Sequence, residues 1–234
     1  MKRIVAVLVV QLLTVLTPAV YAQEKAETQH KLIEFHMALL KRGANSSTKE
    51  SPTKELVDQH KAYVLSSLES GKAVIAGPVG DDGELVGVYV FRASSAQEAK
   101  AWAEADPLVK AGHLKTEMHP WWSEDVMKKP ATPIKLTTAY LAFLTRGSKW
   151  LPGHTPENEA IQKAHMANIN RLAETKKLVV AGPFGDDGQL RGIFVFKVSS
   201  LEEAKGLAAT DPAVQAGRLA LEIHPWMVPE GILP

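Results

Sequence analysis

Hydrophobic residues recur along the chain with two spacings, one typical of helices and one typical of strands. Two stripes with a four-residue spacing are Leu56, His60, Val64 and Leu68, and Ile161, His165, Ile169 and Ala173. Residues spaced in this way share one face of a helix, so each stripe predicts a helix with one apolar side. Short apolar runs predict strands around these helices; they cover 33–40, 73–79, 85–91, 114–121 and 140–144.

Polar residues mark where these elements begin and end. Gly80-Asp81-Asp82-Gly83 separates two strand runs and predicts a hairpin turn. Ser94 or Ser95, with Glu98 in the first turn, predicts the start of a second helix. Asp106-Pro107 predicts the cap and the first residue of a further short helical turn. With the last strand run, the predicted order is βαββαβ, that of the ferredoxin-like split unit.

The whole unit occurs twice in the chain. Segment 76–83 recurs at 181–188, and the same offset of 105 residues relates three further pairs. They are His60 and His165, Asp106 and Asp211, and His119-Pro120-Trp121 and His224-Pro225-Trp226. Chance does not produce such a register, so we predict two homologous domains, a first copy at 31–127 and a second copy at 136–230. Residues 128–135 form the predicted linker, because two prolines interrupt it.

The alternation of side chains along the last strand predicts how the copies pack. Successive side chains point to opposite faces of a sheet. Leu114 and Met118 therefore share one face, and Glu117, His119 and Trp121 share the other. The apolar face suits the helices, whereas the mixed face needs another cover. We predict an α+β fold in which two ferredoxin-like βαββαβ units pair through their sheets, as a pseudo-dimer within one chain, around a semi-polar cavity.

The N-terminus has the pattern of a secretory signal peptide. Lys2 and Arg3 precede an apolar run at 4–16, and Ala22 ends a segment of small residues before a polar stretch. The apolar run is shorter than the roughly 20 residues of a membrane-spanning helix. We therefore predict a signal peptide at 1–22 and a soluble product, periplasmic or secreted, without a membrane anchor after cleavage.

Composition and charge narrow the function classes. The 234 residues include 27 Lys and Arg against 26 Asp and Glu, a net charge of +1, whereas nucleic-acid-binding domains usually carry a basic excess. We therefore expect no nucleic-acid partner. The absence of cysteine excludes disulfides, a thiol nucleophile and thiolate metal ligands. No Gly-rich phosphate loop or serine nucleophile elbow occurs, so we expect a small-molecule ligand and no cofactor.

The ordered motifs resemble the YCII (YciI-like) family. They are His60-x-x-Tyr63, Ala76-Gly77-Pro78, Ser95-x-x-Glu98-Ala99, Asp106-Pro107 with Ala111-Gly112, and the closing His119-Pro120-Trp121. The resemblance covers each copy almost fully and implies the dimeric α+β barrel superfamily, in which two βαββαβ units pair through their sheets. It also implies a catalytic His–Asp pair, carried here by His60 with Asp106 and by His165 with Asp211.

The resemblance further implies a class of reaction. A related dehydrochlorinase and the muconolactone isomerases of the wider superfamily point to proton transfer on small unsaturated or cyclic acids. We therefore predict a proton-transfer enzyme of the lyase or isomerase type acting on a small organic acid. The chain departs from the family pattern in its export, in its tandem fusion, and in Asn168, which stands where the first copy has Tyr63. The last departure weakens the second site.

His60 and Asp106 each have two interpretations. His60 is either a core histidine bonded to a backbone carbonyl or a general base whose ring a carboxylate orients. Asp106 is a helix cap, and it can be the partner of His60 as well, because a carboxylate has two oxygens. The helical stripe places His60 between helix and sheet, whereas the predicted cavity lies on the opposite face of the sheet.

The predicted cavity has its own candidate residues. Those expected to bind substrate are Tyr63, Glu117, His119, Trp121, Glu222, His224 and Trp226. Glu117 and His119, with His36 on the same face, would also make a loose metal site, but His36 corresponds to Tyr140 in the second copy, and we predict no metal. Arg42 or Arg146 is a candidate for pairing a substrate carboxylate.

A second function class stays open beside the enzyme. The same features fit a non-catalytic small-molecule-binding or structural module of the periplasm, and further oligomerisation of the pseudo-dimer fits both. A separation below about 4 Å between a ring nitrogen of His60 and a carboxylate oxygen of Asp106 favours the enzyme. A cavity blocked by Trp121 or Trp226 favours a structural role.

Overall fold

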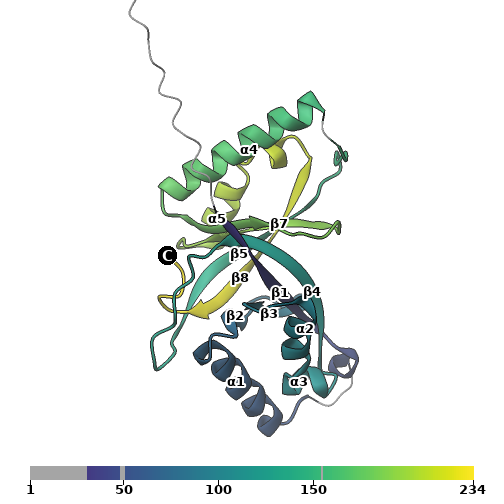
Figure 1. The fold of residues 1–234 in the computed structure, drawn as a ribbon, viewed down its shortest axis with the longest axis vertical. Helices are drawn as coiled ribbons and strands as arrows, with labels where there is room; N and C mark the ends of the chain where they lie inside the picture. The colour runs from purple at the N-terminus through teal and green to yellow at the C-terminus, as the bar shows by residue number, and fades with distance from the viewer. Residues whose placement is uncertain (1–30, 48–50, 154) are drawn as a thin grey trace, which may run out of the picture. The chain divides into compact units, whose positions relative to one another are not determined.

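Each copy folds into a four-stranded antiparallel sheet with helices on one face, as the computed structural model of residues 31–47, 51–153 and 155–234 shows (Figure 1). The predicted signal peptide lies outside these described residues. The elements of the first copy are β1 (Leu32–Arg42), the 3₁₀ turn η1 (Ala44–Ser47), α1 (Lys54–Glu69), β2 (Ala73–Pro78), β3 (Leu85–Phe91), α2 (Ala96–Glu104), α3 (Pro107–Lys110) and β4 (Leu114–Glu124). Those of the second copy are β5 (Leu136–Arg146), α4 (Pro156–Glu174), β6 (Leu178–Pro183), β7 (Leu190–Phe196), α5 (Leu201–Ala208), α6 (Pro212–Gln215) and β8 (Leu219–Pro229).

The strand order is β2-β3-β1-β4 in one sheet and β6-β7-β5-β8 in the other. This is the order of the ferredoxin-like unit, and the predicted fold class is confirmed. The helix starts follow from local capping. Ser95 accepts a hydrogen bond from the Glu98 amide, and the Glu98 carboxylate accepts in turn from the Ser94 amide. Asp106 caps α3 with Pro107 as its first residue, as predicted.

The two sheets cover each other, as the alternation in the last strand predicted. The indole of Trp121 in β4 donates to the carbonyl of Gly182 in β6, and that of Trp226 in β8 donates to the carbonyl of Gly77 in β2, both at 3.2 Å. Both indoles are fully buried. An apolar cluster therefore joins the two copies; among its members are Phe35, Met37, Leu141, Phe143, Trp121 and Trp226. The helix face of the second copy has a separate core.

Main-chain bonds join the edges of the sheets. The Gly185 amide donates to the Pro120 carbonyl, and the Gly80 amide donates to the Pro225 carbonyl, both at 2.8 Å. Proline has no N–H to donate, so it is tolerated on an edge strand, and here its carbonyl bonds to the facing copy. The closing His-Pro-Trp motif thus supplies both an edge carbonyl and a buried indole to the contact between the copies.

Gly77 and Gly182 let the main chains approach closely at the same place. A Cβ on Gly77 would lie 1.7 Å from the carbonyl oxygen of Met227, and one on Gly182 would lie 1.8 Å from that of Trp122. The glycine of the Ala-Gly-Pro motif is therefore required for steric reasons, since any side chain would overlap the main chain of the other copy.

The linker and the end of the chain pack on this contact. The Lys128 amide donates to the Ile232 carbonyl (2.9 Å) and the Glu230 amide donates to the Lys135 carbonyl (2.8 Å). Ile232 and Leu233 are buried in the cluster that joins the copies. The tail that follows the predicted second copy thus contributes to the apolar cluster between the copies.

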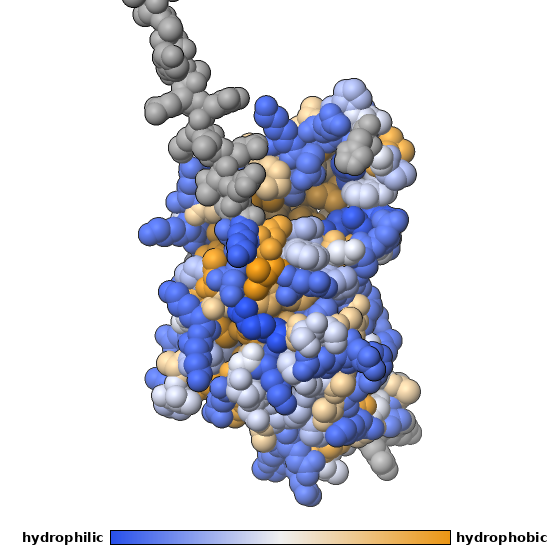
Figure 2. Space-filling model, viewed as in Figure 1, coloured by the Kyte–Doolittle hydropathy of each residue, from blue (hydrophilic) through white to orange (hydrophobic). Residues whose placement is uncertain are grey.

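The visible surface is mostly hydrophilic, with small separate apolar areas (Figure 2). The large exposed hydrophobic residues are Leu32, Leu65, Trp122, Leu136, Leu151 and Met166. Within the described part of the chain, none of the helices has the length and apolar character that crossing a membrane requires.

Candidate functional site

The predicted His–Asp pair forms in the first copy. His60 lies in α1 and Asp106 caps α3, and the Nδ1 atom of His60 is 2.8 Å from Oδ2 and 2.9 Å from Oδ1 of Asp106. The amide of Leu108 donates to Oδ1 at 2.8 Å. Asp106 therefore acts as helix cap and as histidine partner at once. Its side chain is fully buried, whereas the side chain of His60 is 21% exposed, so the pair reaches the surface through the imidazole.

A third residue, Tyr89 of β3, completes the pair. Its hydroxyl donates to Oδ2 of Asp106 at 2.7 Å, and its ring stacks on Phe91 with centroids 5.1 Å apart. Sequence reasoning did not single out Tyr89. The available signal was a hydroxyl inside an otherwise apolar strand run, but the equivalent residue in the second copy is Phe194, so the repeat did not point to it.

The surroundings of Asp106 keep its carboxyl ionised. Burial alone would raise the pKa of this group, but the hydrogen bond and the charge of His60 act against burial. The Tyr89 hydroxyl and the Leu108 amide add to their effect, and the pKa of Asp106 lies below its ordinary value. Burial and the charge of Asp106 raise the pKa of Tyr89 far above its ordinary value. Tyr89 is therefore a hydrogen-bond donor at neutral pH.

The ionised carboxylate decides the tautomer of His60. A carboxylate only accepts hydrogen bonds, so Nδ1 must carry a proton, and in the neutral ring Nε2 is then the basic atom. Within the described residues, His60 Nε2 has no hydrogen-bond partner. A histidine oriented by a buried carboxylate, with its other nitrogen free, has the geometry of a general acid–base catalyst.

Acid is expected to destabilise the protein through Asp106. A carboxyl whose pKa is lower in the folded chain than its unfolded value of about 3.9 stabilises the fold above that pH, and this stabilisation is lost as the pH falls through the folded pKa. The free energy of unfolding should therefore decrease below about pH 4. The decrease should be smaller in Asp106→Asn, whose amide takes up no proton. Urea unfolding at a series of acidic pH values measures both slopes, and equal slopes would contradict the assignment.

Tyr63 lies near the pair but does not bond to it. Its hydroxyl donates to the carbonyl of Trp102 in α2 at 2.5 Å. Burial raises its pKa, with a further increase from the charge of Asp106. Tyr63 therefore ties α1 to α2 in this structure. Its predicted role in substrate binding stays a prediction.

The second copy repeats the pair with different neighbours. His165 Nδ1 lies 2.7 Å from Asp211 Oδ2, and the side chain of His165 is 11% exposed. Phe194 supplies no hydroxyl; its ring stacks on His165 with centroids 5.9 Å apart. Asn168 Nδ2 makes only a long contact of 3.4 Å to Asp211. The Ala213 amide donates to Asp211 Oδ1 at 2.9 Å, so the second carboxylate differs from the first in its long third hydrogen bond, and its histidine is less accessible to solvent.

Glu117 and His119 lie on the opposite face of the sheet, against the other copy. His119 Nδ1 is 2.6 Å from Oδ2 of Asp186, which lies in the turn after β6, and its Nε2 is 2.9 Å from Glu117 Oε1. The arrangement is repeated by His224, with Asp81 at 2.6 Å and Glu222 at 3.1 Å. We call these two groups the inter-copy clasps.

Each clasp holds an imidazole between two carboxylates. Carboxylates accept hydrogen bonds, so each ring nitrogen of the two histidines faces an acceptor. The aspartates of the clasps come from the Gly-Asp-Asp-Gly turns, to which the sequence assigned only a turn. Trp121 and Trp226, with fully buried rings, occupy the same interface. The side chains of Glu117 and Glu222 are exposed, whereas the two indoles are closed to solvent. The substrate-binding role of these residues stays a prediction.

His36 does not join the first clasp, and the expectation that it shares a face with His119 is wrong. Residues paired directly across two strands share a face, and it is Met37 that pairs with His119, while His36 pairs with Pro120. The side chain of His36 therefore points to the helix side. Among the described residues, no group of three His, Asp or Glu side chains is arranged to hold a metal ion.

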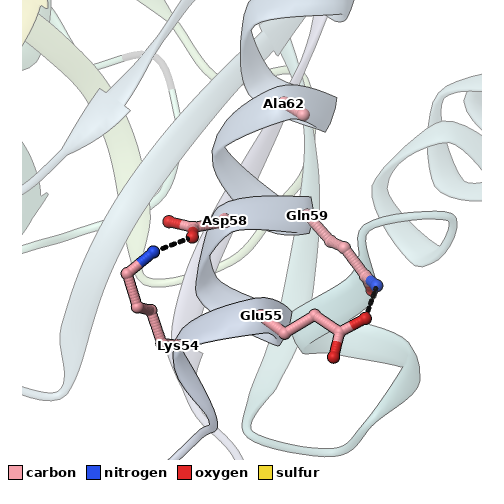
Figure 3. A pocket seen from close by; sticks show the side chains of 5 residues that line it. All are labelled: Lys54, Glu55, Asp58, Gln59 and Ala62. Carbon is pink, nitrogen blue, oxygen red and sulfur yellow. Dashed lines mark hydrogen bonds and ion pairs between the residues drawn. The ribbon is translucent and has the colours of Figure 1, made fainter.

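A shallow surface depression on α1 lies apart from the pair. Its lining residues are Lys54, Glu55, Asp58, Gln59 and Ala62 (Figure 3). They follow the outer face of the helix and pair among themselves, Lys54 with Asp58 and Gln59 with Glu55. His60 is not among them, so this depression has no acid–base pair.

Comparisons with known proteins agree with this fold. The family model of the YCII-related domain matches residues 16–121 and 142–227. The uncharacterized protein YjpA of Bacillus subtilis (strain 168) is 34% identical over 76 residues, which are 31% of this chain and 87% of that protein.

Two solved structures share the architecture. A chlorite dismutase mutant of Candidatus Nitrospira defluvii in complex with cyanide has a TM-score of 0.54 at 12% identity, covering 85% of this chain and 92% of that one. A heme-binding protein of Thermus thermophilus has a TM-score of 0.50 at 15% identity, covering 84% and 93%. At such identities the likeness concerns the fold alone. Because the family model matches both copies over most of the chain, the protein belongs to the family of YCII-related domains, and it carries that domain twice.

Proposed function

We propose that the protein is a proton-transfer enzyme of the lyase or isomerase type that acts on a small organic acid, with His60 and Asp106 as its acid–base pair. The observation that carries the proposal is the contact of 2.8 Å between His60 Nδ1 and Asp106 Oδ2, which leaves Nε2 without a partner among the described residues. A buried structural histidine would have both nitrogens satisfied within the fold.

The proposed step moves one proton. His60 Nε2 takes a proton from a carbon next to a carbonyl or carboxyl group, so the C–H electron pair becomes an enolate and the ring becomes imidazolium. Asp106 stays ionised and stabilises that imidazolium. In an isomerisation the proton returns to a different carbon. In an elimination the electron pair forms a double bond, and the leaving group departs with its own pair.

The experiment is a screen for exchange of carbon-bound hydrogen with solvent deuterium, followed by NMR, over a set of small unsaturated and cyclic acids. The wild-type protein is expected to catalyse exchange in at least one of them, and the double variant His60→Gln, His165→Gln is expected to be inactive while still folded. His36→Gln is the matched control, because His36 lies on the helix side of the same sheet without a carboxylate partner closer than 4.0 Å.

The outcome separates the two function classes. Exchange that survives in the double variant would refute the pair. If an acid binds but shows no hydrogen exchange under any condition, the alternative function, a small-molecule-binding module, would be favoured over an enzyme.

We further propose that the protein is exported to the periplasm or secreted. The support is the sequence of residues 1–22, with its basic start, apolar run and small residues. N-terminal sequencing of the protein from its native host is expected to begin after Ala22. A mature protein that begins at Met1 and stays with the cytoplasmic fraction would refute export.

A further inference from the structure

Three arginines of the second copy surround a single tryptophan. The guanidinium carbons of Arg146, Arg191 and Arg218 lie 5.4, 5.1 and 4.5 Å from the centroid of the Trp150 ring. Arg146 ends β5, Arg191 lies in β7, Arg218 precedes β8, and Trp150 lies in the loop after β5. Segments distant in sequence thus bring three positive charges to one aromatic ring. We call this group the arginine cluster.

The cluster has too little negative charge for its three cations. Among the described residues, one carboxylate pairs with it, that of Asp187, 2.6 Å from Arg146 and 3.5 Å from Arg191. The Asp187 side chain is 95% exposed, so water weakens this pairing. The Asp186 carboxylate is near Arg191 but is bonded to His119 of the other copy. Three guanidinium groups against one carboxylate leave an excess of two positive charges.

The hydrogen bonds of the arginines leave donors unused. Beyond Asp187, their partners in the described part of the chain are neutral: the carbonyls of Asp186, Asp187, Gly188 and Leu151 and the amide oxygen of Asn158. The Nε atom of Arg146 is buried and has no partner in the described part of the chain. A buried donor without a partner destabilises the fold, so the contacts within the fold do not account for the cluster.

The first copy builds the same backbone without this cluster. Ser46 takes the place of Trp150, since the amides of both bond back to an equivalent glycine. Val86 stands where the second copy has Arg191, because their carbonyls accept hydrogen bonds from the equivalent amides of Val79 and Phe184. His113 stands where the second copy has Arg218, because their carbonyls accept from the equivalent amides of Gly43 and Gly147. Arg42 alone corresponds to an arginine of the cluster, and it donates to the carbonyl of Gly83. The fold therefore does not require the cluster.

We propose that the arginine cluster is a binding site for a small oxyanion, a phosphate or a carboxylate group, present only in the second copy. Guanidinium groups bind such anions through paired N–H donors in a fixed fork. The indole holds the guanidinium planes by cation–π contacts, which limits the entropy lost on binding. The exposed carboxylate of Asp187 competes for the same donors and is displaced. This site is separate from the acid–base pair of the first copy.

The test is isothermal titration calorimetry of the full chain with two probes, inorganic phosphate and succinate. The variant Arg191→Val, Arg218→His carries the residues of the first copy at these positions. It is expected to bind the preferred probe at least about tenfold more weakly than the wild type. Asp187→Asn is expected to bind several-fold more tightly, because it removes the internal competitor. Arg92→Gln is the matched control in the first copy, because Arg92 pairs with Asp125 and lies outside the cluster, and it is expected to bind as the wild type does.

The two probes also identify the anion. Binding of phosphate alone assigns a phosphate group, binding of succinate alone assigns a carboxylate, and binding of both assigns a general oxyanion site. The proposal is overturned when neither probe binds up to roughly 10 mM, or when the double variant binds as well as the wild type. Circular dichroism of each variant checks that it is folded. A double variant with a lower melting temperature but the affinity of the wild type would show that the cluster only stabilises the loop.

Discussion

The variants Gly77→Ala and Gly182→Ala are each expected to lower the free energy of unfolding by about 3–5 kcal/mol, near the upper end for single substitutions. The added methyl would lie 1.7 Å from the Met227 carbonyl oxygen in one case and 1.8 Å from that of Trp122 in the other. Both neighbours are main-chain atoms, so no side-chain rotation relieves the overlap. The strands of the two copies must separate there, which breaks the bonds that the two glycine carbonyls accept from Trp226 and Trp121.

Urea unfolding with the matched control Gly206→Ala measures this effect. Gly206 lies in α5, and a Cβ there would meet nothing within 4 Å. Alanine is a better helix former than glycine by up to about 1 kcal/mol, so the control should be as stable as the wild type or slightly more stable. Wild-type stability in Gly77→Ala and Gly182→Ala would mean that the copies do not pack this closely in solution.

In His60→Gln, kcat/KM for the acid found by the deuterium screen is expected to fall by about 10²–10⁴-fold, the range for loss of a general acid–base residue. Asp106→Asn is expected to lose a similar factor. The amide would present N–H to Nδ1, so the ring would move its proton to Nε2 and lose its base. His165→Gln is expected to have the smaller effect, because His165 is less exposed and its partner Asp211 lacks a tyrosine donor.

Tyr89→Phe is the control for this series, since it gives the first copy the residue of the second at that position. It keeps the contact between His60 and Asp106 and removes one hydrogen bond to the carboxylate. A hydrogen bond to a charged group contributes about 1.5–3 kcal/mol, so the fall should be smaller than in His60→Gln. Full activity in His60→Gln would exclude this histidine as the base.

The comparison of sequence and structure shows which contacts local patterns reveal. The stripe through His60 and the cap at Asp106 were both readable, because periodicity and capping act within one or two turns of chain. The repeat supported them, since both residues recur at the same offset. The same dependence on repetition hid Tyr89, Trp150, Arg191 and Arg218, whose equivalents in the other copy have different chemistry.

The alternation of side chains along the last strand predicted a semi-polar space between the sheets, but it did not predict the contacts made there. The mixed face of the last strand predicted that the sheets would meet, and they do. It did not reveal that His119 and His224 would be held by Asp186 and Asp81. The second of these contacts joins residues 143 positions apart, and nothing local specifies it. The face of His36 was also mistaken, because register between two strands depends on pairing across the sheet.

The sequence by itself determined the βαββαβ order, the duplication and the sheet faces that must meet, because these follow from spacing, caps and repetition along the chain. The His–Asp pairs were expected from the resemblance to the YCII family. Only the tertiary structure decided which carboxylate each histidine bonds to, which ring nitrogen stays free, and how three arginines gather on one tryptophan. Those properties depend on distances between segments far apart in sequence. The balance of charge and burial that gives a side chain its chemistry exists only after such segments have packed together.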